Sequence, residues 1–110
     1  MTKPLLYDVK FTETYVRALT LIKRHGRTIA GRVHVDAEDL ALLPDQKGKP
    51  LVGALAGLWS RRSSRQRYRI IYRIDKHALV VEVLFAGIRR EGSRQDVYQI
   101  AERTFRKKRA

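Results

Sequence analysis

The chain has 110 residues, of which 44% are hydrophobic and 32% charged, with only 7 glycines and 3 prolines. This length suits one folded domain with a single core, and it is too short for a catalytic domain joined to an independent binding domain. The absence of cysteine excludes disulfides and thiolate metal sites, and it fits a reducing compartment. Because the sequence shows neither a signal-peptide core nor an apolar run of about 20 residues, we expect a soluble, cytoplasmic protein.

The formal net charge of +13 is distributed unevenly along the chain. Residues 1–57 carry 9 lysines and arginines against 6 acidic residues, a net charge of +3, whereas residues 58–110 carry 15 against 5, a net charge of +10. Clustered arginine binds phosphate through paired hydrogen bonds and gains from counterion release. A merely soluble cationic surface is the alternative, and we favour a nucleic acid as the partner of the second half.

The first elements follow from apolar periodicity and capping signals. Residues 5–11 alternate between apolar and polar side chains, which predicts a strand whose odd-numbered residues, Leu5 included, face the core. Thr12 is a suitable helix N-cap, and residues 13–25 then place apolar side chains at helical spacing. An acid in the first turn, a basic last turn and a following Gly26 complete the signals of a helix.

A second helix is predicted over residues 28–43, with a break near Val35, where β-branched residues weaken the helical pattern. The following residues, 44–50, form a turn-rich basic loop that contains Lys47 and Lys49. This loop separates the helical half of the chain from a half that is rich in strand signals.

Three strands are predicted after the loop, over residues 58–63, 67–75 and 78–86, and a tight turn joins the last two into a hairpin. In the middle strand the even-numbered residues, from Tyr68 to Ile74, share an apolar face. We therefore expect one face of the sheet to pack and the other to display guanidinium groups. The arginines on that second face are Arg67, Arg69 and Arg73.

After Gly87 we expect a polar loop over residues 88–92 and then a helix that begins near Ser93. The basic tail, residues 106–110, is expected to be frayed. The sequence thus predicts an α+β fold, a single domain over residues 1–110. It comprises an N-terminal strand, two helices packed on an antiparallel sheet of three further strands, and a C-terminal helix.

Short motifs occur in a fixed order along the second half of the chain. They are Lys47-Gly48-Lys49-Pro50-Leu51, Gly57-Leu58-Trp59, Tyr68-Arg69-Ile70-Ile71-Tyr72-Arg73-Ile74-Asp75, Ala86-Gly87-Ile88-Arg89-Arg90-Glu91 and Asp96-Val97-Tyr98. Together with the order of elements, this set resembles the RelE/ParE toxin superfamily, and the last two motifs resemble its RelE branch. The resemblance covers nearly the whole chain.

The resemblance implies RNA cleavage without a metal or other cofactor, in which the ribose 2′-OH attacks the adjacent 3′-phosphate and leaves a 2′,3′-cyclic phosphate. Arg69 and Arg89 match the family's two phosphate-stabilising arginines, which act on charge that develops in the transition state. Tyr98 matches an aromatic residue that stacks on a substrate base. Surface ion pairing, for example with Glu82 or Glu91, is the alternative for the arginines, and a core position is the alternative for Tyr98.

The resemblance also implies two lysines for proton transfer, on the strand before the Tyr-Arg strand, and this sequence departs from it. Ser60, Arg61 and Arg62 occupy that stretch. Arginine stays protonated at neutral pH and is a poor general base, so we expect Arg61 and Arg62 to bind RNA. Glu82 and Glu91 are possible bases, although ion pairing explains them better.

Other basic side chains complete the expected RNA-binding surface. The three histidines are expected at a helix C-terminus (His25), on a helix surface (His34) and in a turn (His77), away from the arginines. We therefore assign no histidine to catalysis. The further candidates for RNA binding are Lys47, Lys49, Arg67, Arg73 and Arg90.

The predicted function is that of a type II toxin, a ribosome-dependent mRNA endonuclease that inhibits translation. Its expected partners are the ribosome, mRNA and a cognate antitoxin, whose acidic, partly helical segment would cover the basic face or displace the C-terminal helix. Two alternatives stay open because one fold hosts several functions. One is a ParE-like toxin that inhibits DNA gyrase without nuclease activity, and the other is a non-catalytic nucleic-acid-binding module. In each case Trp59 is expected to pack in the core or against a loop.

Overall fold

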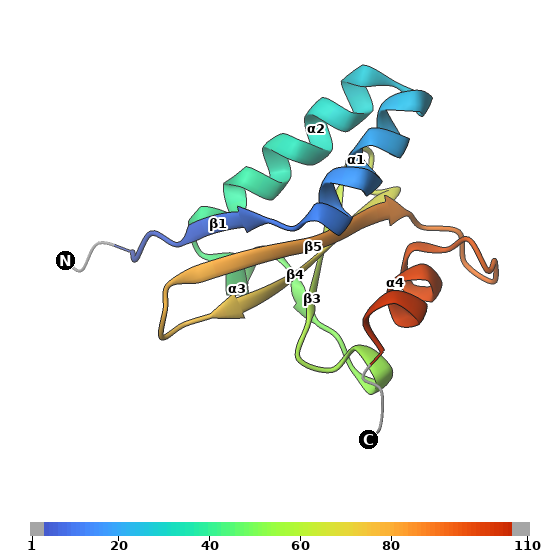
Figure 1. Ribbon diagram of the computed structural model, residues 1–110. Helices are drawn as coiled ribbons and strands as arrows, with labels where there is room; N and C mark the ends of the chain where they lie inside the picture. The colour runs from blue at the N-terminus through green and yellow to red at the C-terminus, as the bar shows by residue number, and fades with distance from the viewer. Residues whose placement is uncertain (1–3, 107–110) are drawn as a thin grey trace.

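A computed structural model describes residues 4–106, and the predicted frayed tail beyond Arg106 lies outside the described residues. The centre of the fold is a five-stranded sheet in the order β1-β5-β4-β3-β2 (Figure 1). β1 runs parallel to β5, and every other neighbouring pair is antiparallel. The strands are β1 (Asp8–Phe11), β2 (Lys49–Pro50), β3 (Trp59–Ser63), β4 (Tyr68–Asp75) and β5 (Val80–Ile88).

Helices cover both faces of this sheet. α1 (Glu13–His25) and α2 (Arg27–Glu38) lie on one face, and α4 (Val97–Phe105) lies on the other (Figure 1). The larger core cluster, between the sheet and the first two helices, includes Tyr15, Val33 and Tyr72, each fully buried. The smaller cluster joins α4 to Ile71 of the sheet. The predicted α+β class and order of main elements are confirmed.

α1 forms as the sequence predicts. The Thr12 hydroxyl accepts a hydrogen bond from the backbone N–H of Tyr15 at 3.2 Å, and the last turn is basic, with His25 at its end. Gly26 then separates α1 from α2. None of the helices in residues 4–106 is long and apolar enough to cross a membrane.

The predicted extent of the second helix, residues 28–43, is wrong at its C-terminal end. α2 ends at Glu38, and a 3₁₀ turn (Asp39–Ala41) follows. The proline at position 44 disfavours the helical conformation for the residue before it, and Leu43 adopts φ 51° instead. The expected break near Val35 does not occur, because burial of the neighbouring turns against the sheet outweighs the weak local propensity.

Strand boundaries also differ from prediction. β1 begins at Asp8, and Leu5 is 62% exposed, so its predicted place on the core face is wrong. β5 continues through Gly87 to Ile88, whereas the predicted strand ends at residue 86 and the predicted loop begins at Ile88. Part of the loop predicted over residues 44–50 forms a helical turn, α3 (Pro44–Lys47), and the short strand β2.

α4 starts four residues later than predicted, at Val97 instead of Ser93. Asp96 is its N-cap, and one carboxylate oxygen accepts the backbone N–H of Tyr98 at 3.1 Å. The helix approaches the sheet closely at Gly87, where a Cβ atom would lie 3.2 Å from the Cγ2 atom of Val97. The absence of a side chain at Gly87 therefore allows α4 to pack closely against β5.

Two aromatic predictions have different outcomes. Trp59 packs against the larger core cluster and stacks on Tyr72 with ring centroids 6.4 Å apart, as expected. His34 is not a plain surface group of a helix. It is half-buried beside Phe11, and its Nδ1 atom lies 2.9 Å from the hydroxyl of Tyr15. Burial of Tyr15 is the main reason that its pKa lies above the usual range.

Candidate functional site

A basic groove opens on the face of the sheet that carries α4, and we call it the α4-side groove. It has a volume of about 860 Å³. Its floor is formed by β3 and β4, one wall by the segment 46–51, and the other by the residues that follow β5. Its lining includes most of the predicted site residues, which are Lys47, Lys49, Arg61, Arg62, Arg69, Arg89 and Tyr98.

Arg62 and Arg69 lie directly opposite each other on β3 and β4. Like charges at paired positions of a sheet are destabilising, so this placement needs compensation. Gln66, in the connecting turn, supplies part of it. Its side-chain oxygen accepts a hydrogen bond from Arg62 at 3.3 Å, and its backbone carbonyl accepts one from Arg69 at 2.7 Å. The hydrogen bonds to Gln66 thus hold the two guanidinium groups in place, and the groups remain available to an anion.

Arg89 enters the same groove from the end of β5. Arg69 on β4 pairs with Gly87 on β5, and Arg89 comes two residues after Gly87. The sheet therefore brings both predicted phosphate-stabilising arginines to one region. The Nη1 atom of Arg89 lies 2.7 Å from a carboxylate oxygen of Asp96. The ion-pairing alternative therefore applies to Arg89, with Asp96 as the main partner and the exposed Glu91 at 3.4 Å.

Asp96 is a buried carboxylate with several hydrogen-bond donors. Burial by itself would raise its pKa, but hydrogen bonds from Arg89 and from the backbone N–H groups of Arg90 and Tyr98 outweigh that effect and lower it. In return, the hydrogen bond to Asp96 raises the pKa of Arg89. One side chain therefore fixes the charge and position of Arg89 and the start of α4.

Tyr98 is half-buried at the wall of the groove. Its hydroxyl lies 2.8 Å from the Oγ atom of Ser60, and the Arg89 guanidinium lies over its ring, 4.9 Å from the centroid. The ring also packs against the smaller core cluster, so the core alternative is partly correct. The hydrogen bond and the cation–π contact fix the direction of the ring.

Two predicted RNA-binding residues have structural partners within the protein. Arg61 donates to the backbone carbonyl of Asp36 at 2.9 Å and to the carboxylate of Asp39 at 3.0 Å. Lys47 donates to the backbone carbonyl of Asp39 and also pairs with its carboxylate at 3.0 Å. The hydrogen bond from Lys47 is the largest cause of the lowered pKa of Asp39. Both cations thereby hold the end of α2 against the sheet.

The remaining predicted cations do not line the α4-side groove. Arg73 pairs with Glu82 on the neighbouring strand, which removes that acid as a nearby base. Arg90 lines an apolar pocket between α1 and α4, and Arg67 lines a second basic groove beside α2. Among the described acids, Glu91 is the one that lines the α4-side groove.

Asp96 and Ser60 are the functional candidates that sequence reasoning missed. The signal for Asp96 was present, because an acid directly before an apolar helix pattern is a typical N-cap. Ser60 carried no such signal. Its proximity to Tyr98 depends on how α4 packs across β3, over a separation of 38 residues.

Comparisons with known proteins identify relatives of this chain. No family model matches the chain. Toxin RelG of Mycobacterium tuberculosis is 39% identical over 93 residues, which is 84% of this chain and 97% of that protein. The toxin-antitoxin complex RelBE2 of M. tuberculosis contains a chain 36% identical, with a TM-score of 0.67, covering 81% of this chain and 98% of that one.

More distant structures share the fold alone. A double mutant of the Escherichia coli toxin RelE in the free state is 22% identical with a TM-score of 0.57, over 86% of this chain and 98% of that one. A YoeB/ParE toxin of Agrobacterium tumefaciens is 21% identical with a TM-score of 0.62, over 76% of this chain and 99% of that one. The fold and the similarity to Toxin RelG thus place the chain in the RelE/ParE toxin superfamily. At 39% identity to Toxin RelG over most of its length, the chain belongs to the RelE family of toxins.

Proposed function

We propose that this protein is a ribosome-dependent mRNA endonuclease that works in the cytoplasm and inhibits translation. The observation that carries the proposal is the convergence of Arg62, Arg69 and Arg89 on one groove that also presents Tyr98. A phosphate in this groove would be surrounded by guanidinium donors, while a neighbouring base stacks on the tyrosine. No metal or cofactor is needed for cleavage by the ribose 2′-OH.

The arginines act on the transition state. As the 2′-oxygen attacks the phosphorus atom, negative charge grows on the nonbridging oxygens. Donors that are already in place stabilise this charge more than that of the ground state. The contacts of Arg69 with Gln66 and of Arg89 with Asp96 supply that preorganisation.

Proton transfer is the weaker part of this machinery. Glu91 is 89% exposed and pairs loosely with Arg89, so it is a poorly fixed acceptor. The ribosome would compensate by aligning the 2′-OH with the phosphate, since positioning alone supplies a large share of a barrier reduction. We accordingly expect purified protein to cleave free RNA poorly. Efficient cleavage of naked RNA in buffer would contradict the dependence on the ribosome.

The test is expression from a tightly controlled promoter, followed by mapping of the 5′ ends of cellular mRNA. Removal of each groove arginine should lower cleavage by about 10²–10³-fold, so the Arg69→Ala, Arg89→Ala double variant should lack new ends. Arg73→Ala is the matched control, because Arg73 lies on the same strand outside the groove. Growth arrest with unchanged mRNA ends would sink the nuclease. DNA damage signalling in that case would indicate gyrase, and no growth defect would indicate a binding module.

We also propose that an antitoxin with an acidic segment neutralises the basic second half of the chain. The related M. tuberculosis structure is a toxin-antitoxin complex. The net charge of +10 on residues 58–110 gives an acidic, partly helical segment a complementary surface. Co-expression of the toxin with a candidate antitoxin that carries an acidic segment, followed by co-purification, tests this partner.

A further inference from the structure

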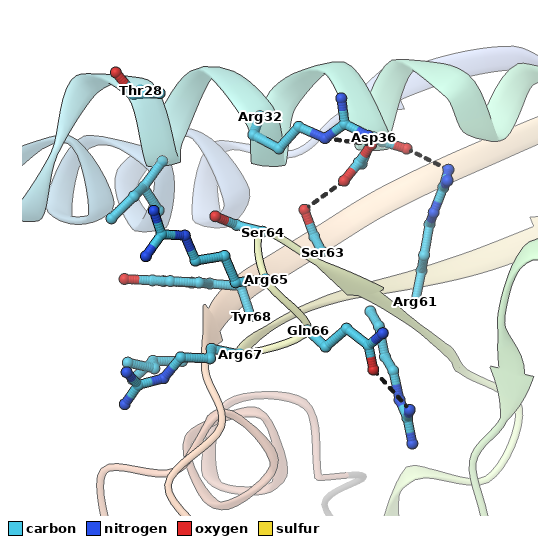
Figure 2. A pocket seen from close by; sticks show the side chains of 13 residues that line it. Thr28, Arg32, Asp36, Arg61, Ser63, Ser64, Arg65, Gln66, Arg67 and Tyr68 are labelled. Carbon is cyan, nitrogen blue, oxygen red and sulfur yellow. Dashed lines mark hydrogen bonds and ion pairs between the residues drawn. The ribbon is translucent and has the colours of Figure 1, made fainter.

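A second basic groove lies on the opposite face of the sheet, beside α2, and we call it the α2-side groove (Figure 2). It has a volume of about 880 Å³. α2 forms one wall and the β3–β4 hairpin the other. Its lining includes Thr28, Arg32, Asp36, Arg61, Ser63, Arg65, Arg67 and Tyr68.

The acidic side chain in this groove is already occupied. Asp36 is buried. Its Oδ2 atom accepts a hydrogen bond from the Ser63 hydroxyl at 2.7 Å, and its Oδ1 atom lies 3.5 Å from the Nε atom of Arg32. In contrast, Arg65 and Arg67 are exposed, and no carboxylate within residues 4–106 lies in ion-pair distance of either. The groove therefore has two guanidinium groups without an internal counterion.

The hydroxyl of Tyr68 lies at the same end of the groove. Most of the Tyr68 side chain is buried, since the residue is only 7% exposed, but its hydroxyl is not among the buried polar atoms and has no hydrogen-bond partner within the described part of the chain. In Figure 2 this hydroxyl points toward the end of the groove to which Arg65 and Arg67 extend. A hydroxyl left unpaired among free guanidinium groups is suited to a ligand oxygen.

The first turn of α2 closes this end. Its N-cap, Gly26, provides no side-chain hydrogen bond, so the N–H groups of the first turn remain available to an anion. Thr28 belongs to that turn and lies at the same end of the groove in Figure 2. Helix N-terminus, hydroxyl and arginines thus offer donors of the kind that bind phosphate.

The turn between β3 and β4 connects the two grooves. Ser64, Arg65 and Gln66 adopt φ angles of 34°, 53° and 60°, a left-handed run that side chains other than glycine rarely adopt. Gln66 of this turn contacts Arg62 and Arg69 of the α4-side groove, and together with Arg65 and Arg67 it also lines the α2-side groove. A continuous phosphate backbone passing over the turn would meet cations on both sides.

We propose that the α2-side groove is a second phosphate-binding site, in which Arg65, Arg67 and the Tyr68 hydroxyl hold the RNA backbone outside the cleaved nucleotides. This inference rests on the proposed function and extends it to the path of the RNA. It assigns the groove to positioning and affinity, not to the chemical step.

Binding of an oligonucleotide with 2′-O-methyl groups, which cannot be cleaved, tests the proposal by fluorescence anisotropy over a range of salt concentrations. For single strands, removal of one cation that neutralises a phosphate lowers the salt slope by about 0.7, so Arg65→Ala, Arg67→Ala should lower it by about 1.4. The control is Lys10→Ala, Arg17→Ala, which removes the same charge from β1 at the other edge of the sheet and from α1. An equal change in both double variants would overturn the site in favour of general charge.

Tyr68→Phe distinguishes an effect on RNA binding from an effect on folding, because it removes only the hydroxyl and keeps the ring. We expect a several-fold weaker affinity for the long oligonucleotide, an unchanged melting temperature and unchanged binding of a dinucleotide. Unchanged affinity for the long oligonucleotide would overturn the role of the hydroxyl. These readouts do not require cleavage, so failure of the nuclease proposal would appear in the mRNA ends and not here.

Two further arms of the experiment identify the ligand. Inorganic phosphate should compete weakly, since it binds at one point where a backbone binds at several. Polyglutamate should compete with RNA for the wild type as well as it does for the Arg65→Ala, Arg67→Ala variant, or less well. Strong competition by phosphate would reassign the groove to a free anion, and polyglutamate competition that disappears in the variant would reassign it to an acidic protein segment.

Discussion

Arg89 and Asp96 form an ion pair across the loop that joins β5 to α4, with their nearest nitrogen and oxygen atoms 2.7 Å apart. The Asp96 side chain is 2% exposed and the Arg89 side chain 30% exposed, so the acid lies behind the arginine as seen from the groove. Asp96 also caps α4, which begins one residue before Tyr98. The pair therefore couples Arg89, the proposed phosphate-binding residue, to Tyr98, the proposed base-stacking residue.

Asp96→Asn should separate positioning from folding. Asparagine caps a helix about as well as aspartate, but it cannot neutralise Arg89. Loss of the charged hydrogen bond should lower the free energy of unfolding by about 1.5–3 kcal/mol. Cleavage should fall more than the folded fraction does, while RNA affinity should rise or stay constant because Arg89 keeps an uncompensated charge. Parallel measurement of denaturant unfolding, anisotropy and ribosomal cleavage checks all three.

Asp75→Asn is the matched control for that variant. Asp75 also accepts backbone N–H groups, from His77 and Ala78, but it lies at the end of β4, outside the groove. It should leave cleavage unchanged at equal folded fraction. If Asp96→Asn weakens RNA binding and cleavage in proportion to its loss of stability, Asp96 acts through the fold alone.

The pH dependence of stability follows from two carboxyl groups with lowered pKa. The pKa of Asp39 is lowered mainly by the hydrogen bond from Lys47. The pKa of Asp96 is lowered because its hydrogen-bond donors outweigh the opposite effect of its burial. A carboxyl whose folded pKa lies below its unfolded value of about 3.9 stabilises the fold above that pH. That contribution is lost as the pH falls through the folded pKa. Wild-type stability should therefore drop below about pH 4, and the Asp39→Asn, Asp96→Asn variant should show a flatter acid limb in chemical denaturation.

The two roles of Tyr98 can be tested by paired substitutions. Tyr98→Phe keeps the ring under Arg89 and loses only the hydrogen bond to Ser60, so cleavage should change by less than about tenfold. Tyr98→Ala removes the stacking surface and should cost about 1–3 kcal/mol of substrate binding. Ser60→Ala removes the same hydrogen bond from the other side and should match Tyr98→Phe. If Phe and Ala at position 98 behave alike, the hydroxyl carries the function and stacking does not.

The sequence predicted those elements whose signals are local. α1 has a capping threonine, a helical apolar pattern and a glycine stop, and its predicted and observed bounds agree. The predicted end of the second helix at residue 43 was wrong because Pro44 disfavours the helical conformation of Leu43, a constraint that the apolar pattern of Leu40 and Leu43 concealed. β2 has only two residues and forms by pairing with β3, so no period of its own was available.

For the candidate site, the sequence predicted which face of the sheet carries the arginines, but not the residues within the protein that contact them. Alternation in β4 put Arg69 on the face opposite the main core, and that face indeed holds the α4-side groove. Alternation also grouped Arg73 with Arg69, but Glu82 on the neighbouring strand pairs with Arg73. The contacts of Arg61 with Asp39, and of Ser60 with Tyr98, join segments distant in sequence. Such contacts follow from tertiary packing, which a periodic pattern does not encode.

Gly48 tests how tightly the wall of the groove is built, with Gly31 as its control. Gly48 has an extended backbone, so its requirement is space: an added Cβ would overlap the Tyr72 hydroxyl and lie 2.6 Å from the backbone oxygen of Ser60. The Tyr72 hydroxyl is held by the carbonyl of Pro44 at 2.8 Å, so it has little freedom to move aside. Gly48→Ala should therefore push the wall away from β3 and destabilise the fold by about 1–3 kcal/mol.

Gly31 lies within α2, and nothing stands within 4 Å of a Cβ built there. Gly31→Ala should stabilise the protein by up to about 1 kcal/mol, because alanine loses less backbone entropy than glycine in a helix. Thermal unfolding of both variants gives the signs, and ribosomal cleavage at a temperature where both are folded gives the consequence for the groove. Lys47 and Lys49 flank Gly48, so its substitution should also lower cleavage, while Gly31→Ala should not. A Gly48→Ala protein with wild-type stability and activity would mean that the wall yields easily and does not fix the groove.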